Sequence, residues 1–119
     1  MADMKTYTGS CHCGSVRFEA STDLNKVLQC NCSICSRAGY LLTFVPPEQF
    51  KLLQGEEQLK DYQFNKKRIH HLFCSNCGVH SFGQGTGPGG KQMYAVNVRC
   101  LEGVEPSGLA ITQFDGKSM

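Results

Sequence analysis

One short segment constrains this chain more than any other. Cys30-Asn31-Cys32-Ser33-Ile34-Cys35 places three thiols within six residues. The segment is short and polar, so we expect none of these side chains to fold away into a core. Three thiolates this close together suit a soft or borderline-soft metal ion, and zinc is the default ion for such a set. A structural zinc takes four protein ligands and a catalytic zinc commonly three, so the ligand count bears on function.

The length and the cysteine content limit the class of protein. The chain has 119 residues and 8 cysteines, which indicates a single domain over residues 1–119 that is either a disulfide scaffold or a metal protein. Residues 1–6 lack the apolar stretch of a signal peptide, and no apolar run is long enough to span a membrane. We therefore expect a cytoplasmic protein with reduced, metal-bound thiols and no membrane partner. The net charge of +2, with both signs dispersed, is no nucleic-acid signature.

Hydrophobic periodicity predicts an all-β fold. Short runs with period two are separated by Gly, Pro and Asn about every ten residues, and no window shows a sustained 3.6-residue stripe. The predicted strands are residues 15–20, 41–45, 50–53, 58–64, 68–73, 79–82 and 93–101. Residues 46–50 predict a turn or a single helical turn, because Pro suits a first helical turn. The glycine-rich residues 83–90 predict a hairpin connection and not a phosphate loop.

Two further cysteine clusters frame the central one, and both end in Cys-Gly. These are Cys11-His12-Cys13-Gly14 and Cys74-Ser75-Asn76-Cys77-Gly78. In a Cys-x-x-Cys-Gly turn the glycine adopts a positive φ, which lets backbone amides turn toward the sulfurs. Two such half-sites supply the four sulfurs of a complete structural zinc site, and a metal there would stabilise a small β domain.

This pairing leaves Cys30, Cys32 and Cys35 as three ligands with one open coordination position. Two alternatives remain open. The three thiols can take a fourth ligand from Cys11 or Cys13, or some of them can form disulfides, although a Cys-x-Cys disulfide closes a strained ring. The eighth thiol, Cys100, follows an alternating segment with Tyr94, Val96 and Val98 on its face, so we interpret it as a buried, inert cysteine.

Other polar residues have weaker signals. His71 shares a strand face with Ile69 and Phe73, which favours a core or rim histidine over a ligand. Arg37 lies two residues after the central cluster, where it can neutralise the thiolates or bind an anionic substrate. His80 receives no role.

The clusters, in order, resemble the glutathione-dependent formaldehyde-activating enzyme family, which includes the related domain of centromere protein V. The resemblance rests on four segments, namely residues 9–14, 30–35, 73–80 and 96–101, and spans about residues 5–105. It implies a β-rich, tent-like fold of short antiparallel sheets with at most single helical turns, and two zinc ions per chain. It places a structural zinc on Cys11, Cys13, Cys74 and Cys77, and a catalytic zinc on Cys30, Cys32 and Cys35.

The resemblance implies a carbon–sulfur lyase that joins glutathione to formaldehyde. An open zinc held by three thiolates favours a thiol over an oxygen ligand and lowers the thiol pKa. The resulting thiolate can add to the carbonyl carbon of a small aldehyde. His71 and Arg37 are candidates for supplying the proton. Two alternatives are a non-catalytic zinc scaffold for a macromolecular partner and a thiol or metal sensor.

Overall fold

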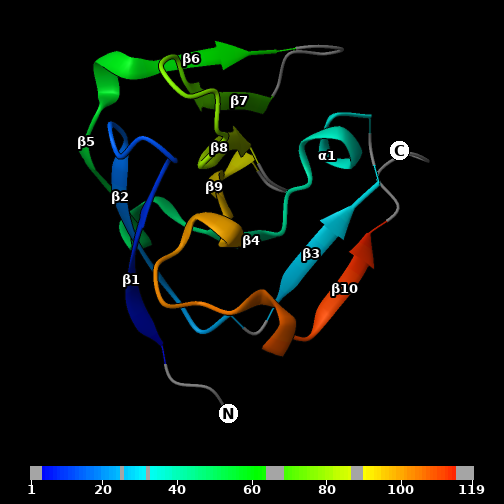
Figure 1. Ribbon diagram of the computed structural model, residues 1–119. Coiled ribbons are helices and arrows are strands. Elements are labelled where there is room, and N and C mark those ends of the chain that lie inside the picture. Colours follow the sequence, from blue (N-terminus) through cyan, green and yellow to red (C-terminus); the bar gives the residue numbers. More distant parts are fainter. Residues whose placement is uncertain (1–3, 25, 32, 64–68, 87–89, 115–119) are drawn as a thin grey trace.

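The computed structural model describes residues 4–24, 26–31, 33–63, 69–86 and 90–114 of the chain. Strands dominate this part of the molecule, which confirms the all-β prediction (Figure 1). The strands are β1 (Lys5–Ser10), β2 (Arg17–Thr22), β3 (Val27–Cys30), β4 (Leu42–Val45), β5 (Phe50–Gln54), β6 (Leu59–Tyr62), β7 (Ile69–Cys74), β8 (Phe82–Thr86), β9 (Gln92–Asn97) and β10 (Ile111–Phe114). The helix α1 covers Ser33–Ala38, and 3-10 turns cover Pro47–Gln49 (η1), Glu56–Gln58 (η2), Val98–Cys100 (η4) and Pro106–Gly108 (η5).

The strands form two sheets. The smaller sheet has the order β1-β2-β5 and is antiparallel throughout. The larger sheet has seven strands in the order β10-β3-β4-β9-β8-β7-β6. One pair departs from the expected antiparallel arrangement, because β10 runs parallel to β3 (Figure 1).

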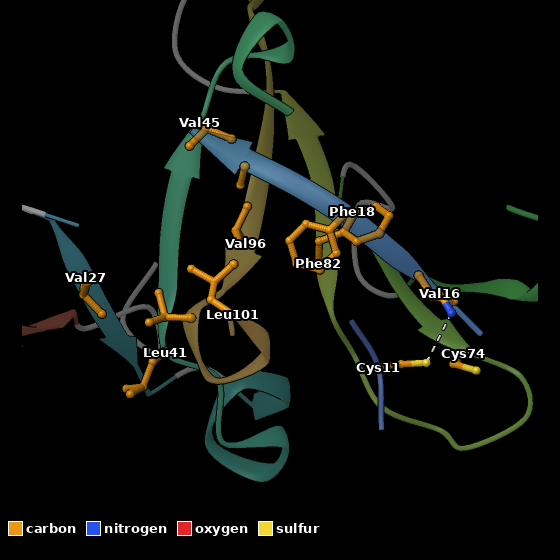
Figure 2. Close-up of a cluster of buried hydrophobic side chains, with 12 residues drawn as sticks. Cys11, Val16, Phe18, Val27, Leu41, Val45, Cys74, Phe82, Val96 and Leu101 are labelled. Atoms are coloured by element: carbon orange, nitrogen blue, oxygen red, sulfur yellow. Dashed lines mark hydrogen bonds between the residues drawn. The ribbon is translucent and has the colours of Figure 1, made fainter. Parts of the chain in front are cut away.

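The hydrophobic core lies between the two sheets. The alternation in β2 buries Phe18 and Ala20 completely, as a strand with one face on a core requires. The Phe18 ring stacks on Phe50 at 5.4 Å and meets the edge of Phe82 from β8 at 5.6 Å. Figure 2 shows Val16, Cys11 and Cys74 at one end of this buried cluster. The core therefore extends to Cys11 and Cys74, one cysteine from each of the two half-sites.

Several sequence-based boundaries need correction. The strand predicted at residues 79–82 instead begins at Phe82 and continues to Thr86, into the segment expected to be a connection. The strand predicted at residues 93–101 ends at Asn97, where the chain turns into η4. Helix α1 has six residues, which exceeds a single turn of ~3.6 residues. Strands β1, β3 and β10 were missed.

Other boundaries agree with the prediction. The 3-10 turn η1 begins at Pro47, as the proline signal indicated. Parts of two predicted strands, residues 64 and 68, lie outside the described residues, as does Cys32. No helix in the described ranges is long and apolar enough to cross a membrane.

Candidate metal centre and adjoining pocket

Four cysteine sulfurs from two distant parts of the chain gather at one point. Cys11 and Cys13 follow β1, Cys74 ends β7, and Cys77 lies in the turn after it. Their sulfur atoms all lie within 4.8 Å of one another. Cys11 Sγ and Cys74 Sγ are each 3.6 Å from Cys13 Sγ. The structure thus brings together the four residues that the two Cys-Gly clusters contribute.

The two half-sites have closely similar backbone turns. The amide of the first cysteine donates to the carbonyl five residues later in both, from Cys11 to Val16 and from Cys74 to Val79, each at 3.1 Å. Each turn then closes at a glycine in the left-handed region, with φ of 82° at Gly14 and 81° at Gly78. In the first half-site the Val16 amide also donates to Cys11 Sγ at 3.4 Å (Figure 2). The glycines thus fill the positive-φ role that the sequence predicted.

The four sulfurs fit a tetrahedral zinc ion. Zn–S bonds of about 2.3 Å in a tetrahedron place neighbouring sulfurs ~3.8 Å apart. The separations of 3.6 Å are close to this value, and far longer than the ~2.0 Å of a disulfide bond. The donor set and its spacing therefore suit a metal ion.

The thiols of this cluster have unequal acidity. Burial raises the pKa of Cys11 to about 11. The Ser15 hydroxyl, 3.2 Å from Cys13 Sγ, stabilises the exposed thiolate and, with Asn76, lowers the pKa of Cys13 to about 5. The Cys13 thiol therefore ionises more readily than the Cys11 thiol, and the thiolate is the form that binds a metal.

The central cluster is built on two secondary-structure elements. Cys30 ends β3, and Cys35 lies in α1 with only 7% of its surface exposed. The expectation that no cysteine of this segment is buried was therefore wrong for Cys35, because the helix turns it toward the core. Cys32 lies outside the described residues, so the three-sulfur site remains a prediction.

A pocket of about 580 Å³ adjoins α1. Its lining residues are Ser33, Ile34, Arg37, Ala38, Tyr62 and His80. Four of the six come from the helix that carries Cys35. Tyr62 ends β6 on the neighbouring hairpin, and His80 follows the second half-site. A small molecule in this pocket would lie against the helix that carries Cys35.

His80 is the site residue that the sequence analysis missed. Its ring packs edge-on against Tyr40, with ring centres 5.5 Å apart, and at a tilt of 46° against Phe73, with ring centres 5.2 Å apart. Burial lowers the pKa of His80 below its ordinary value, and its buried Nδ1 has no hydrogen-bond partner among the described residues. These contacts are tertiary, so the only available sequence signal was the position of His80 three residues after Cys77.

The other candidates have mixed outcomes. His71 is half-buried, as a rim histidine would be, and burial lowers its pKa, helped by the nearby His80. Arg37 lines the pocket, while its Nη1 donates to the Ser33 carbonyl at 2.9 Å. Cys100 lies in η4 and not on a strand, so the face assigned to it was wrong. It packs partly buried against the core, and burial raises its pKa to about 11.

Comparison with known proteins agrees with this architecture. Residues 6–112 match the glutathione-dependent formaldehyde-activating enzyme family. The chain belongs to this family. The fold is also similar to the crystal structure of a Rhodobacter sphaeroides protein, a structural-genomics target, with a TM-score of 0.77 and 32% sequence identity. That match covers 88% of this chain and 99% of the other.

Proposed function

We propose that this protein is a carbon–sulfur lyase-type enzyme, similar to S-(hydroxymethyl)glutathione synthase, that adds a thiol such as glutathione to a small aldehyde such as formaldehyde. The observation that carries the proposal is the division of the cysteines. Four sulfurs gather into one group, while Cys30 and Cys35 lie outside that group, beside and within the helix that lines the pocket. A structural site that takes its four ligands from this group would not need the central cysteines as ligands.

Two zinc ions are part of the proposal. Cys11, Cys13, Cys74 and Cys77 would hold a structural ion, and Cys30, Cys32 and Cys35 would hold a catalytic one. When bound by three thiolates, the second ion would supply a coordination position that prefers sulfur and lowers the pKa of an incoming thiol.

The reaction itself is a balanced addition. A carbon–sulfur bond forms between the thiol sulfur and the carbonyl carbon, and the carbonyl double bond becomes a single bond. The thiol proton ends on the former carbonyl oxygen, giving a hemithioacetal. Because nothing else is gained or lost, the reverse step is the lyase reaction.

The pocket side chains supply binding and proton transfer. Arg37 has guanidinium donors beyond the one used on Ser33 and can hold a carboxylate of the thiol. Burial lowers the pKa of His80, which favours the neutral imidazole at pH 7. This imidazole can take the thiol proton and return a proton to the developing alkoxide. Ile34 and Ala38 add apolar surface to the lining of the pocket.

The proposal includes a cellular setting. A thiolate-rich site of this kind requires a reducing compartment, so we place the protein in the cytoplasm. The formal charge of +2 is small, and we propose no nucleic-acid partner and no membrane partner.

Exchange spectroscopy tests the proposal. Two-dimensional ¹³C NMR can measure the interconversion of ¹³C-formaldehyde and S-(hydroxymethyl)glutathione against the uncatalysed rate. The wild type should accelerate it, and Cys32→Ser should return it to the uncatalysed rate. Cys100→Ala is the matched control, since Cys100 belongs to neither proposed ligand set, and should stay active. A zinc-loaded wild type without acceleration would contradict the proposal and favour the scaffold or sensor alternative.

A further inference from the structure

One sequence motif has no part in the chemistry described so far. The segment Val96-Asn97-Val98-Arg99-Cys100-Leu101 contains no proposed zinc ligand. It ends β9 and forms the turn η4. Asn97 is a buried polar residue with only 7% of its surface exposed, and a buried amide group is tolerated only when its hydrogen bonds are satisfied.

Asn97 fixes the backbone on the His80 side of the pocket. Its side-chain Nδ2 donates to the His80 carbonyl at 2.9 Å, and its backbone amide donates to the Ser81 carbonyl at 3.0 Å. The segment that carries the His80 ring is therefore held from one side by this turn.

The next residues of the turn fix the helix side of the pocket. Arg99 Nε donates to the Gly39 carbonyl at 3.2 Å, and the Val98 amide donates to the Leu41 carbonyl at 2.7 Å. Gly39 ends the helix, because its amide donates to the Cys35 carbonyl at 2.9 Å and its φ is 74°. A cation at this position also suits the negative end of the helix dipole.

Asn97 and Arg99 are themselves joined. The Asn97 side-chain oxygen accepts from the Arg99 amide at 3.2 Å and so starts the turn. The Asn97 side chain therefore sets the direction that the backbone takes from the end of β9 to Arg99. As a result, Asn97 holds the His80 wall, Val98 and Arg99 hold the α1 wall, and the hydrogen bond between Asn97 and Arg99 joins the two anchors.

We infer that Asn97 and Arg99 are positioning residues that hold the two walls of the pocket at a fixed separation and thereby determine its fit to the thiol substrate. The inference rests on the proposed function for the identity of the ligand. The hydrogen bonds that hold the two walls do not depend on which ligand the pocket binds.

Arg99→Ala is the primary test, because Arg99 is exposed and its loss leaves the core intact. Amide hydrogen exchange in α1 should become faster, while the thermal midpoint changes little. The KM for glutathione should rise roughly 10-fold with a smaller change in kcat, as expected when pocket walls shift without loss of a reacting group. Arg99→Lys keeps a charged donor and should restore part of the effect. Arg17→Ala is the matched control, since Arg17 pairs with Glu102 and does not line the pocket.

Asn97→Asp gives a second test on the other wall. It keeps the oxygen that accepts from Arg99 but removes the donor to the His80 carbonyl, so the ring resonances of His80 should shift. Unchanged α1 exchange in Arg99→Ala together with unchanged His80 resonances in Asn97→Asp would overturn the inference. A KM for glutathione in Arg99→Ala that is no higher than the KM in Arg17→Ala would also overturn the inference. If the wild type shows no thiol–aldehyde activity, the proposed function fails, and the exchange and resonance measurements still decide the inference.

Discussion

The sulfur atoms of Cys13 and Cys74 lie 3.6 Å apart, although the two residues are 61 positions apart in the sequence. Cys13 follows the edge strand of the three-stranded sheet, and Cys74 ends a strand of the seven-stranded sheet. A metal at this contact would cross-link the two sheets. In small domains of this kind the free energy of metal binding becomes free energy of folding.

The two proposed zinc sites should therefore differ in their effect on stability. Cys74→Ser should lower the thermal midpoint by more than about 10 °C, because it opens the site that joins the sheets. Cys32→Ser should lower it by only a few degrees. Melting curves of both variants at equal zinc concentration provide the comparison. Equal losses would mean that the central cysteines are structural too.

Gly55 should be the glycine most sensitive to substitution near this site. Its φ is 93°, and a Cβ there would lie 2.3 Å from the Ser15 carbonyl oxygen and 2.7 Å from Val16 Cα. Gly55→Ala should destabilise the protein by about 1–2 kcal/mol of backbone strain plus about 1–3 kcal/mol of steric overlap. Gly103→Ala is the control, since its φ is 76° but a Cβ would meet nothing within 4 Å. Urea unfolding should show the larger loss for Gly55→Ala, and equal losses would refute the packing argument.

Stability should fall on acidification because two histidines are held neutral. Burial lowers the pKa of His71 and of His80 below 6.5, and a charge on His80 lowers that of His71 further. Below pH 6.5 the unfolded chain binds protons that the folded protein does not. This stability is fully present above pH 6.5 and is lost as the pH falls from 6.5 through the folded pKa.

The variant His80→Gln isolates this contribution. Protonation of cysteine ligands affects both proteins, so the difference between them reports the histidine. The free energy of unfolding should decrease more steeply for the wild type than for His80→Gln between pH 6.5 and 5. Parallel curves would show that His80 titrates normally in the folded state.

The sequence predicted those parts of the fold and site that depend on local patterns. Alternation predicted a strand over residues 15–20, and in β2 the alternate residues Phe18 and Ala20 are buried. The Cys-Gly pairs predicted two similar turns, because a positive φ at Gly14 and Gly78 follows from local backbone geometry.

The parts that sequence patterns missed depend on tertiary contacts or on short elements. The parallel pairing of β10 with β3 joins distant segments and has no local signal. Helix α1 is too short to show a helical period, so the burial of Cys35 was not foreseen. Alternation continued past Asn97, but its side chain accepts from the Arg99 amide and turns the chain into η4, which moved Cys100 off the strand. The place of His80 in the pocket wall depends on Tyr40, Phe73 and α1.

Thiol binding to the cobalt-substituted protein tests the central claim most directly. Cobalt bound by cysteine shows sulfur-to-metal charge-transfer absorbance that increases with each thiolate ligand. We expect two cobalt ions per chain and, on addition of glutathione, an increase in this absorbance equivalent to one further thiolate. This increase should persist in Cys100→Ala and disappear in Cys32→Ser. An unchanged spectrum on addition of thiol, or the loss of a sulfur ligand in Cys100→Ala, would contradict an open three-cysteine site.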